Sequence, residues 1–250
     1  MSDQQPLLAI VGPTASGKSA VAQRLADEIG ASLISVDSRK VYRGMDIGTA
    51  KPSPEAIARY RYGMIDVCDP DRSFSAGEFS QRARGLVAER LASGEQVILV
   101  GGTGFYLEAF MNGLADLPAV DDSVRAAILA EAGRYGWPAI HERLARIDPG
   151  WAAGISPHDR TRLQRAAEIH AQTGKHPSLW QSELIPEPAP WEVRVFQVEH
   201  PTEELNRLIE NRTDRMISAG LVDEVRHLMA MGYNAESPGM ATVGYQEVIP

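Results

Sequence analysis

Residues Gly12–Ser19 fit the pattern G-x-x-x-x-G-K-[ST] and limit what this chain can fold into more than any other stretch. The apolar run Leu7–Val11 before them predicts a buried strand, and apolar residues at helical spacing after them predict a helix that ends at Gly30. A glycine-rich loop in that position directs its backbone N–H groups at phosphate oxygens, while Lys18 adds a cation and Ser19 offers a hydroxyl to Mg2+. We therefore predict a diphosphate or triphosphate site, against the alternative of a glycine turn that binds nothing. The residues predicted to bind the phosphates are Gly12, Pro13, Thr14, Ala15, Ser16, Gly17, Lys18 and Ser19.

Strand-like and helix-like segments alternate along the first part of the chain. The runs Ser32–Val36 and Gln96–Val100 are typical of buried strands, and Ala76–Ala92 has the spacing of a helix that ends before Gly94. This alternation predicts an α/β fold, with a P-loop NTPase-like parallel sheet flanked by helices.

A later region contains no strand-like run and predicts an all-helical insertion. Its helical stretches are 124–131, 139–147 and 160–173. Three prolines at 186, 188 and 190 then predict a stiff connection to a further strand at 193–198, followed by a helix that Thr202 caps and that ends at Gly220. We expect a catalytic core formed by residues 1–115 and 187–250, and a helical insertion domain at 116–186.

The composition argues against several classes of protein. A net charge of −8 disfavours a protein that coats nucleic acid by bulk electrostatics, and the local positive excess around Arg160–Arg165 is by itself most simply a solvated helix face. No apolar run approaches the ~20 residues that span a bilayer, and Met1–Gln5 does not resemble a leader, so we expect a soluble, cytoplasmic protein without a membrane partner. Cys68 is the only cysteine, and its apolar surroundings predict a core residue. The histidines show no metal-ligand spacing, which leaves magnesium bound with phosphate as the expected metal.

Two polar side chains follow predicted strands. Asp37 comes directly after Ser32–Val36, and Thr103 follows Gln96–Val100 within a glycine-rich turn. Because ligands bind at the carboxyl ends of parallel strands, we expect both residues near the phosphate loop. The alternatives are a turn residue for Asp37 and a satisfied hydroxyl for Thr103.

Three functions remain open on these residues alone. A nucleotide hydrolase is disfavoured, since it usually holds Mg2+ with an acidic residue where this chain has Gly101–Thr103. A small-molecule kinase would use ATP, with Asp37 as the base. A transferase would instead bind an allylic diphosphate, release diphosphate and use Asp37 to deprotonate a weak nitrogen nucleophile. A non-catalytic RNA-binding module, whose loop holds an anion, is the third.

Longer motifs resemble those of the tRNA dimethylallyltransferases, also called tRNA isopentenyltransferases. They are Gly12–Ser19, Ser35–Ser38, Val41–Pro52, Gly101–Gly104, Asp159–Arg165, Arg212–Glu224 and Val243–Tyr245, which together cover nearly the whole chain. The resemblance implies transfer of a dimethylallyl group from dimethylallyl diphosphate to N6 of the adenosine 3′-adjacent to the anticodon in tRNA. It also implies Mg2+ and release of diphosphate, and we expect a monomer that needs no protein partner.

The resemblance further implies roles for individual residues. Asp37 is then the base on N6, Thr103 contacts the leaving oxygen, and Lys18, Ser19 and Arg212 hold diphosphate and metal. The helical insertion is then a surface for the anticodon stem-loop, which favours RNA binding over a solvated face for its arginines. The residues implied in tRNA binding are Asp37, Ser38, Arg39, Lys40, Thr103, Arg125, Thr161, Arg162, Leu163, Gln164, Arg165, Gly244 and Tyr245.

The chain departs from the family pattern in two places. Lys40 stands where the family often has glutamine, which predicts altered base recognition with unaltered chemistry. Family members usually continue for several dozen residues past the position of Pro250 with another basic helical segment, and loss of those contacts would weaken tRNA binding.

Overall fold

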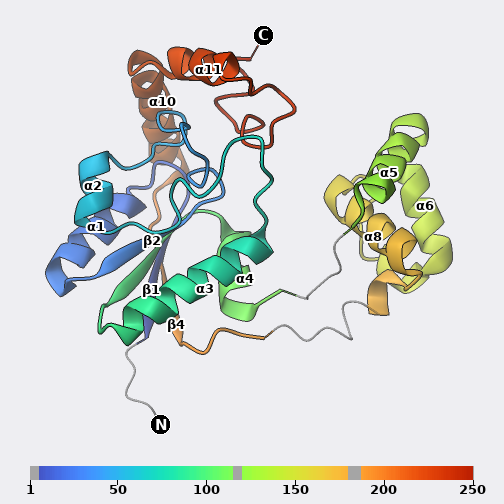
Figure 1. Ribbon diagram of the computed structural model, residues 1–250, viewed down its shortest axis with the longest axis horizontal. Helices are drawn as coiled ribbons and strands as arrows, with labels where there is room; N and C mark the ends of the chain where they lie inside the picture. The colour runs from blue at the N-terminus through green and yellow to red at the C-terminus, as the bar shows by residue number, and fades with distance from the viewer. Residues whose placement is uncertain (1–5, 115–119, 180–186, 250) are drawn as a thin grey trace. The chain divides into compact units, whose positions relative to one another are not determined.

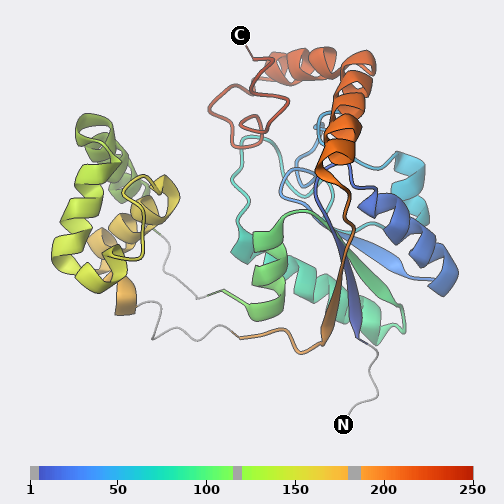
Figure 2. The same ribbon diagram turned by 180° about the vertical axis from the view of Figure 1, so that it is seen from behind.

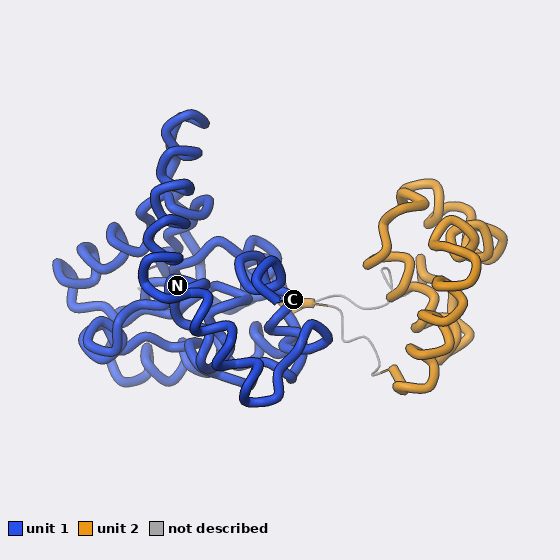
Figure 3. Tube along the Cα trace, turned by 90° about the horizontal axis from the view of Figure 1, so that it is seen from above, with its two compact units in different colours: residues 1–113, 188–250 blue, residues 114–187 orange. Residues whose placement is uncertain are grey.

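The computed structural model describes residues 6–114, 120–179 and 187–249. The chain divides into two compact units, residues 1–113 together with 188–250, and residues 114–187 (Figure 3). The second unit is therefore an insertion in the chain of the first. Each unit has a hydrophobic core of its own.

A parallel sheet forms the centre of the first unit (Figure 1). Its strands are β1 (Leu7–Val11), β2 (Ser32–Val36), β3 (Val97–Gly101) and β4 (Val193–Gln197). They lie in the order β2-β3-β1-β4, and each neighbouring pair is parallel. The last residues of the strands are in register, since Gly101 pairs with both Val11 and Val36, and Val11 also pairs with Gln197. All four strands therefore end along one edge of the sheet.

Helices pack on both faces of this sheet because alternate strand side chains point to opposite sides. The helices described in this unit are α1 (Lys18–Ile29), α2 (Pro54–Arg59), α3 (Ala76–Ala92), α4 (Gly104–Asn112), α10 (Thr202–Ser218) and α11 (Leu221–Ala230). Ala9 and Leu99 contribute to a core with α3 and α4, whereas Ile10 and Ile98 contribute to a second core with α1. Strand β4 lies beside β1 at the edge of the sheet, and α10 rises from its end (Figure 2).

The second unit consists of helices packed around one core. Its described helices are α5 (Asp122–Tyr135), α6 (Trp137–Ile147), α7 (Pro149–Ala152) and α8 (Arg160–Thr173). Ile128, Ile140, Leu144 and Leu163 come together from α5, α6 and α8, and all four are at most 5% exposed. The start of α8 is fixed by Asp159, whose carboxylate accepts a hydrogen bond from the backbone N–H of Arg162 at 3.1 Å.

The predicted α/β fold, a P-loop NTPase-like parallel sheet flanked by helices, is confirmed. The helices predicted at 124–131 and 139–147 are longer in the structure. Helix α5 ends at Tyr135 and α6 begins at Trp137, and Gly136 between them breaks the helix with a φ of 81°. Pro186, the first residue of the predicted proline connection, lies outside the described residues. In the described parts of the chain, we find no helix with the length and apolar character needed to cross a bilayer.

Candidate active site at the phosphate loop

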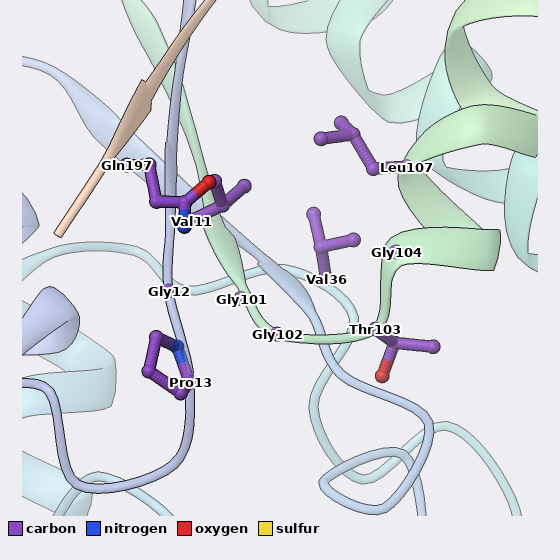
Figure 4. Close-up of a pocket in the computed structure, with 10 residues that line it drawn as sticks. All are labelled: Val11, Gly12, Pro13, Val36, Gly101, Gly102, Thr103, Gly104, Leu107 and Gln197. Carbon is purple, nitrogen blue, oxygen red and sulfur yellow. The ribbon is translucent and has the colours of Figure 1, made fainter. Parts of the chain in front are cut away.

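The carboxyl edge of the sheet surrounds a cavity of about 290 Å³ (Figure 4). Val11, Val36, Gly101 and Gln197, the last residues of the four strands, line it together with the turns that follow β1 and β3. A Cβ on Gly101 would lie 1.9 Å from the carbonyl oxygen of Val36, so only glycine allows these two strands to approach so closely. The close approach brings the turn after β3 next to the turn after β2.

The phosphate loop has the geometry of an anion-binding site. Gly17 adopts a left-handed conformation with φ 79° at the N-cap of α1, where no side chain caps the first N–H groups of the helix. Among the described residues, the buried hydroxyl of Ser16 has no hydrogen-bond partner. A phosphate group can accept hydrogen bonds from the uncapped N–H groups of the helix and from the buried Ser16 hydroxyl.

Neighbouring residues support the loop from both sides. A Cβ on Gly12 would lie 2.7 Å from Ser16 Oγ, which explains the glycine at that position. The ammonium group of Lys18 donates to the carbonyl oxygen of Pro13 across the loop at 2.9 Å. His200, which follows β4, places Nε2 3.1 Å from the carbonyl oxygen of Ser16. Local sequence patterns do not reveal His200, because the contact spans 184 positions in the chain.

Three cations lie around the carboxylate of Asp37. The pKa of Lys18 is lowered, mainly by burial and then by the charges of Lys40 and Arg212. The carboxylate of Asp37 opposes this shift. Burial is also the main cause that lowers the pKa of Lys40 and that of Arg212, and Asp37 opposes both shifts. The site therefore holds an excess of partly desolvated positive charge, which a diphosphate would neutralise.

Asp37 and Thr103 lie side by side at the ends of β2 and β3. Asp37 Oδ1 accepts the backbone N–H groups of Arg39 at 2.9 Å and Lys40 at 3.3 Å, and so closes a turn. Its other oxygen, Oδ2, makes no hydrogen bond with any residue in the described ranges and remains available to accept a proton. Thr103 Oγ1 accepts the backbone N–H of Ser38 at 3.0 Å. Asp37 is thus a turn residue and a candidate base at the same time.

A larger cavity of about 700 Å³ brings most of the predicted substrate residues of this unit together. Apolar side chains from Ile209, Met216, Leu221 and Val248 also line it. The predicted residues that line it are Gly12, Pro13, Thr14, Lys18, Asp37, Ser38, Arg39, Thr103, Arg212 and Gly244. Ala15, Ser16, Gly17 and Ser19 lie in the same phosphate loop but are absent from this lining, and so is Lys40, which is adjacent to Arg39.

The remaining predicted RNA contacts lie on α5 and α8 of the helical unit. Thr161 and Arg162 are exposed in the first turn of α8. Arg125, Gln164 and Arg165 gather around the buried carboxylate of Glu168, which is 3% exposed. Gln164 Nε2 donates to Glu168 at 2.8 Å, and the two arginines lie within 3.6 and 3.7 Å of it.

Two predicted RNA contacts have fully buried side chains. Leu163 is 0% exposed within the core of the helical unit, and Tyr245 is 0% exposed within the core beside α11. A buried side chain packs against its own protein, so neither can present itself to RNA in this conformation. Cys68, at 2% exposed, is a core residue as expected.

A magnesium ion that arrives with a diphosphate fits the oxygen donors of this site. The Ser19 hydroxyl lies in the first turn of α1, directly after Lys18 of the phosphate loop. Mg2+ in such sites typically takes one or two protein oxygens, and phosphate and water supply the rest. Within the described ranges, no three His, Cys, Asp or Glu side chains are placed to hold a metal by themselves. The buried Ser16 hydroxyl, which has no partner among the described residues, can donate a hydrogen bond to the phosphate.

The fold and the site define a P-loop α/β protein with a cavity at the phosphate loop. A family model described as IPP transferase matches residues 40–250. A tRNA dimethylallyltransferase of Geobacter sulfurreducens is 42% identical over 242 residues, which cover 97% of this chain and 78% of that protein. One of Halorhodospira halophila is 44% identical over 246 residues, with 97% and 79% covered. The chain belongs to the IPP transferase family.

Solved structures agree with this assignment. A full-length tRNA isopentenylpyrophosphate transferase from Bacillus halodurans is 35% identical, with a TM-score of 0.65 over 98% of this chain and 76% of that one. A eukaryotic dimethylallyltransferase acting on tRNA has a TM-score of 0.82 at 23% identity, over 98% of this chain and 62% of that one, and supports the fold alone. Of the three functions that the residues left open, these matches support the transferase over the small-molecule kinase and the non-catalytic RNA-binding module.

Proposed function

We propose that the protein transfers a dimethylallyl group from dimethylallyl diphosphate to N6 of the adenosine 3′-adjacent to the anticodon in tRNA. The observation that carries the proposal is the cavity shared by the phosphate loop, Asp37, Thr103 and Arg212. The substitution needs an anion site, a base and an apolar lining in one place. The cavity offers all three, since one oxygen of Asp37 binds no described residue. Family membership supplies the substrate class.

The donor binds with its diphosphate on the phosphate loop. The N–H groups at the start of α1 and the Ser16 hydroxyl contact the phosphate oxygens, while Lys18 and Arg212 balance their charge. Charge grows on the diphosphate as its bond to carbon lengthens, so these cations stabilise the transition state more than the bound substrate. The apolar side chains of α10 and α11 in the same cavity suit a five-carbon chain.

The reaction is a substitution at carbon. The N6 lone pair forms a bond to C1 of the dimethylallyl group, the C1–O bond breaks, and its electron pair leaves with diphosphate. Asp37 Oδ2 takes the proton that N6 loses, while Oδ1 stays bound to the turn. The Thr103 hydroxyl accepts the Ser38 N–H and donates to Ser38 Oγ at 3.4 Å in the structure, and it turns to donate a hydrogen bond to the leaving oxygen when the donor binds. An exocyclic amine conjugated to its ring is a weak nucleophile, which is why both groups matter.

Magnesium supplies further neutralisation of the diphosphate when it is bound. We assign the Ser19 hydroxyl as the protein oxygen that would bind it, because the free oxygen of Asp37 acts as the base. Lys18, Lys40 and Arg212 supply positive charge from the chain itself.

RNA recognition is divided between the two units. The turn Asp37–Lys40 and Gly244 receive the target base, which leaves the anticodon stack at a cost of a few kcal/mol. Arg125, Thr161, Arg162, Gln164 and Arg165 contact the stem-loop. We assign no direct side-chain contact to Leu163 or Tyr245, because both are buried.

The test is a prenylation assay with the 250-residue protein. Dimethylallyl diphosphate and unmodified tRNA should yield RNA that is heavier by one five-carbon unit, together with free diphosphate. The same enzyme supplied with γ-labelled ATP and small alcohols should label no acceptor. Absence of any mass gain, or phosphorylation of an acceptor, would contradict the proposal.

A further inference from the structure

The carboxylate of Glu224 on α11 is hydrogen-bonded to a distant loop. Its Oε2 accepts the backbone N–H of Asp46 at 3.0 Å and that of Ile47 at 2.8 Å. Its Oε1 accepts the N–H of Ile47 at 3.1 Å and that of Gly48 at 3.3 Å. Three successive backbone N–H groups therefore point at one carboxylate from 176 to 178 positions away in the chain.

The same carboxylate also holds a third segment. The hydroxyl of Tyr245 donates to Glu224 Oε1 at 2.5 Å. Burial, followed by the hydrogen bond to Glu224, raises the pKa of Tyr245, so this hydroxyl stays protonated and keeps donating. The ring of Tyr245 lies so close to Gly48 that a Cβ there would be 2.4 Å away. The loop and the tyrosine thus pack against each other where Glu224 binds both.

These segments line the larger cavity next to the phosphate loop. Gly48 and Thr49 come from the loop, Leu221 from the first turn of α11, and Gly244 and Val248 from either side of Tyr245. The phosphate loop, the Asp37 turn, the Thr103 turn and α10 supply the other lining residues named above. If the diphosphate binds on the phosphate loop as proposed above, the segments joined by Glu224 are left to face the other reactant, the base and the carbon it attacks.

We propose that Glu224 is a positioning residue for the acceptor base: it fixes Gly48, Thr49 and Gly244 as one rigid wall of the cavity without touching the substrate. The inference rests on the proposed function for the identity of the acceptor. A carboxylate suits the task because both of its oxygens accept hydrogen bonds and none of its atoms donates. If glutamine replaced Glu224, its NH2 group would face at least one of these backbone N–H groups, and two donors cannot form a hydrogen bond with each other.

The test compares Glu224→Gln with Asp223→Asn, a matched loss of charge on an exposed neighbour in α11. We expect E224Q to lower kcat/KM for tRNA at least tenfold and to leave the Kd of inorganic pyrophosphate within twofold of the wild-type value. Hydrogen exchange of the amides of Asp46, Ile47 and Gly48 should speed up at least tenfold in E224Q. D223N should change none of these quantities by more than twofold.

A second variant separates positioning from general instability. Tyr245→Phe keeps the ring against Gly48 and removes only the hydroxyl, so its loss in kcat/KM should be smaller than that of E224Q. If E224Q kept wild-type kcat/KM despite fast exchange at 46–48, or weakened pyrophosphate binding as much as tRNA turnover, the positioning role would be wrong. Failure of the proposed function is distinguishable, because then wild type prenylates no RNA while the exchange difference persists.

Discussion

Replacing Asp37 by Asn should stop the chemistry and leave the fold intact. In the structure Asp37 Oδ1 closes a turn by accepting two backbone N–H groups, while Oδ2 binds no described residue. The amide oxygen of asparagine can take over both turn hydrogen bonds, but its NH2 group cannot accept a proton. A positioned general base contributes about 10²–10⁴-fold to a rate, so single-turnover prenylation should slow by that factor.

Asp37→Ala is the informative comparison. Alanine loses the base and both turn hydrogen bonds, which costs about 1–2 kcal/mol of stability. For a chain of this size that corresponds to a fall in Tm of about 2–8 °C. The two variants should therefore share the same loss of rate and differ in Tm.

The assay is mass-spectrometric detection of modified tRNA under single-turnover conditions, with Tm measured by circular dichroism. A D37N variant that keeps more than a tenth of the wild-type rate would refute the assignment of Asp37 as the base. Equal Tm values for D37N and D37A would show that the turn does not depend on the Asp37 side chain.

Three further substitutions test other parts of the site. Ser16→Ala removes a buried hydroxyl that has no partner among the described residues, so Tm should stay equal or rise. The Kd of pyrophosphate should increase about 10–150-fold, in line with one lost hydrogen bond to a charged group, and tighter binding would contradict the loop assignment. The affinity of the wild-type protein for pyrophosphate should fall as pH rises toward the lowered pKa of Lys18. Lys40→Gln should move that decline to higher pH, because it removes a charge that repels the Lys18 ammonium group. An unmoved titration curve would argue against an interaction between Lys18 and Lys40. Arg162→Ala should raise KM for tRNA, leave kcat unchanged and reduce the salt slope of binding by about one; a fall in kcat alone would place Arg162 elsewhere in the mechanism.

Local patterns predicted the parts of the fold that depend on neighbouring residues. The phosphate loop, the strands and Ala76–Ala92 follow from spacing and end signals, and the structure gives that helix the same bounds. Contacts between residues far apart in sequence were not predictable in this way. His200 supports Ser16, and Glu224 binds the loop at 46–48, yet no spacing in the chain marks either contact.

Burial limits what the side chains of two predicted RNA-binding residues can contact. A motif shows that Leu163 and Tyr245 matter but not which way their side chains point. Leu163 lies one residue after the exposed Arg162, on the side of α8 that faces the core. The ring of Tyr245 packs against Gly48 from inside the core. Successive side chains of a helix point in different directions, so Leu163 is buried although Arg162 beside it is exposed.

Ligand binding should stabilise the protein strongly, because the site concentrates positive charge. Burial lowers the pKa of Lys18, Lys40 and Arg212, which means that their charged forms are disfavoured in the fold without a bound anion. A diphosphate removes that penalty. At 100 times its Kd, pyrophosphate should add about 2.7 kcal/mol to the stability of the folded state. For a protein of this size the corresponding rise in Tm is about 5–11 °C.

Thermal melting with pyrophosphate, with and without Mg2+, measures this effect, and sulfate at equal ionic strength is the control. The loop N–H groups, the Ser16 hydroxyl and two cations can engage two linked phosphates, whereas sulfate can satisfy only part of that set. Pyrophosphate should therefore stabilise wild type several times more than sulfate does, and S16A should lose part of the difference. Equal shifts from the two anions would mean that the loop responds to charge alone, and the diphosphate assignment would fail.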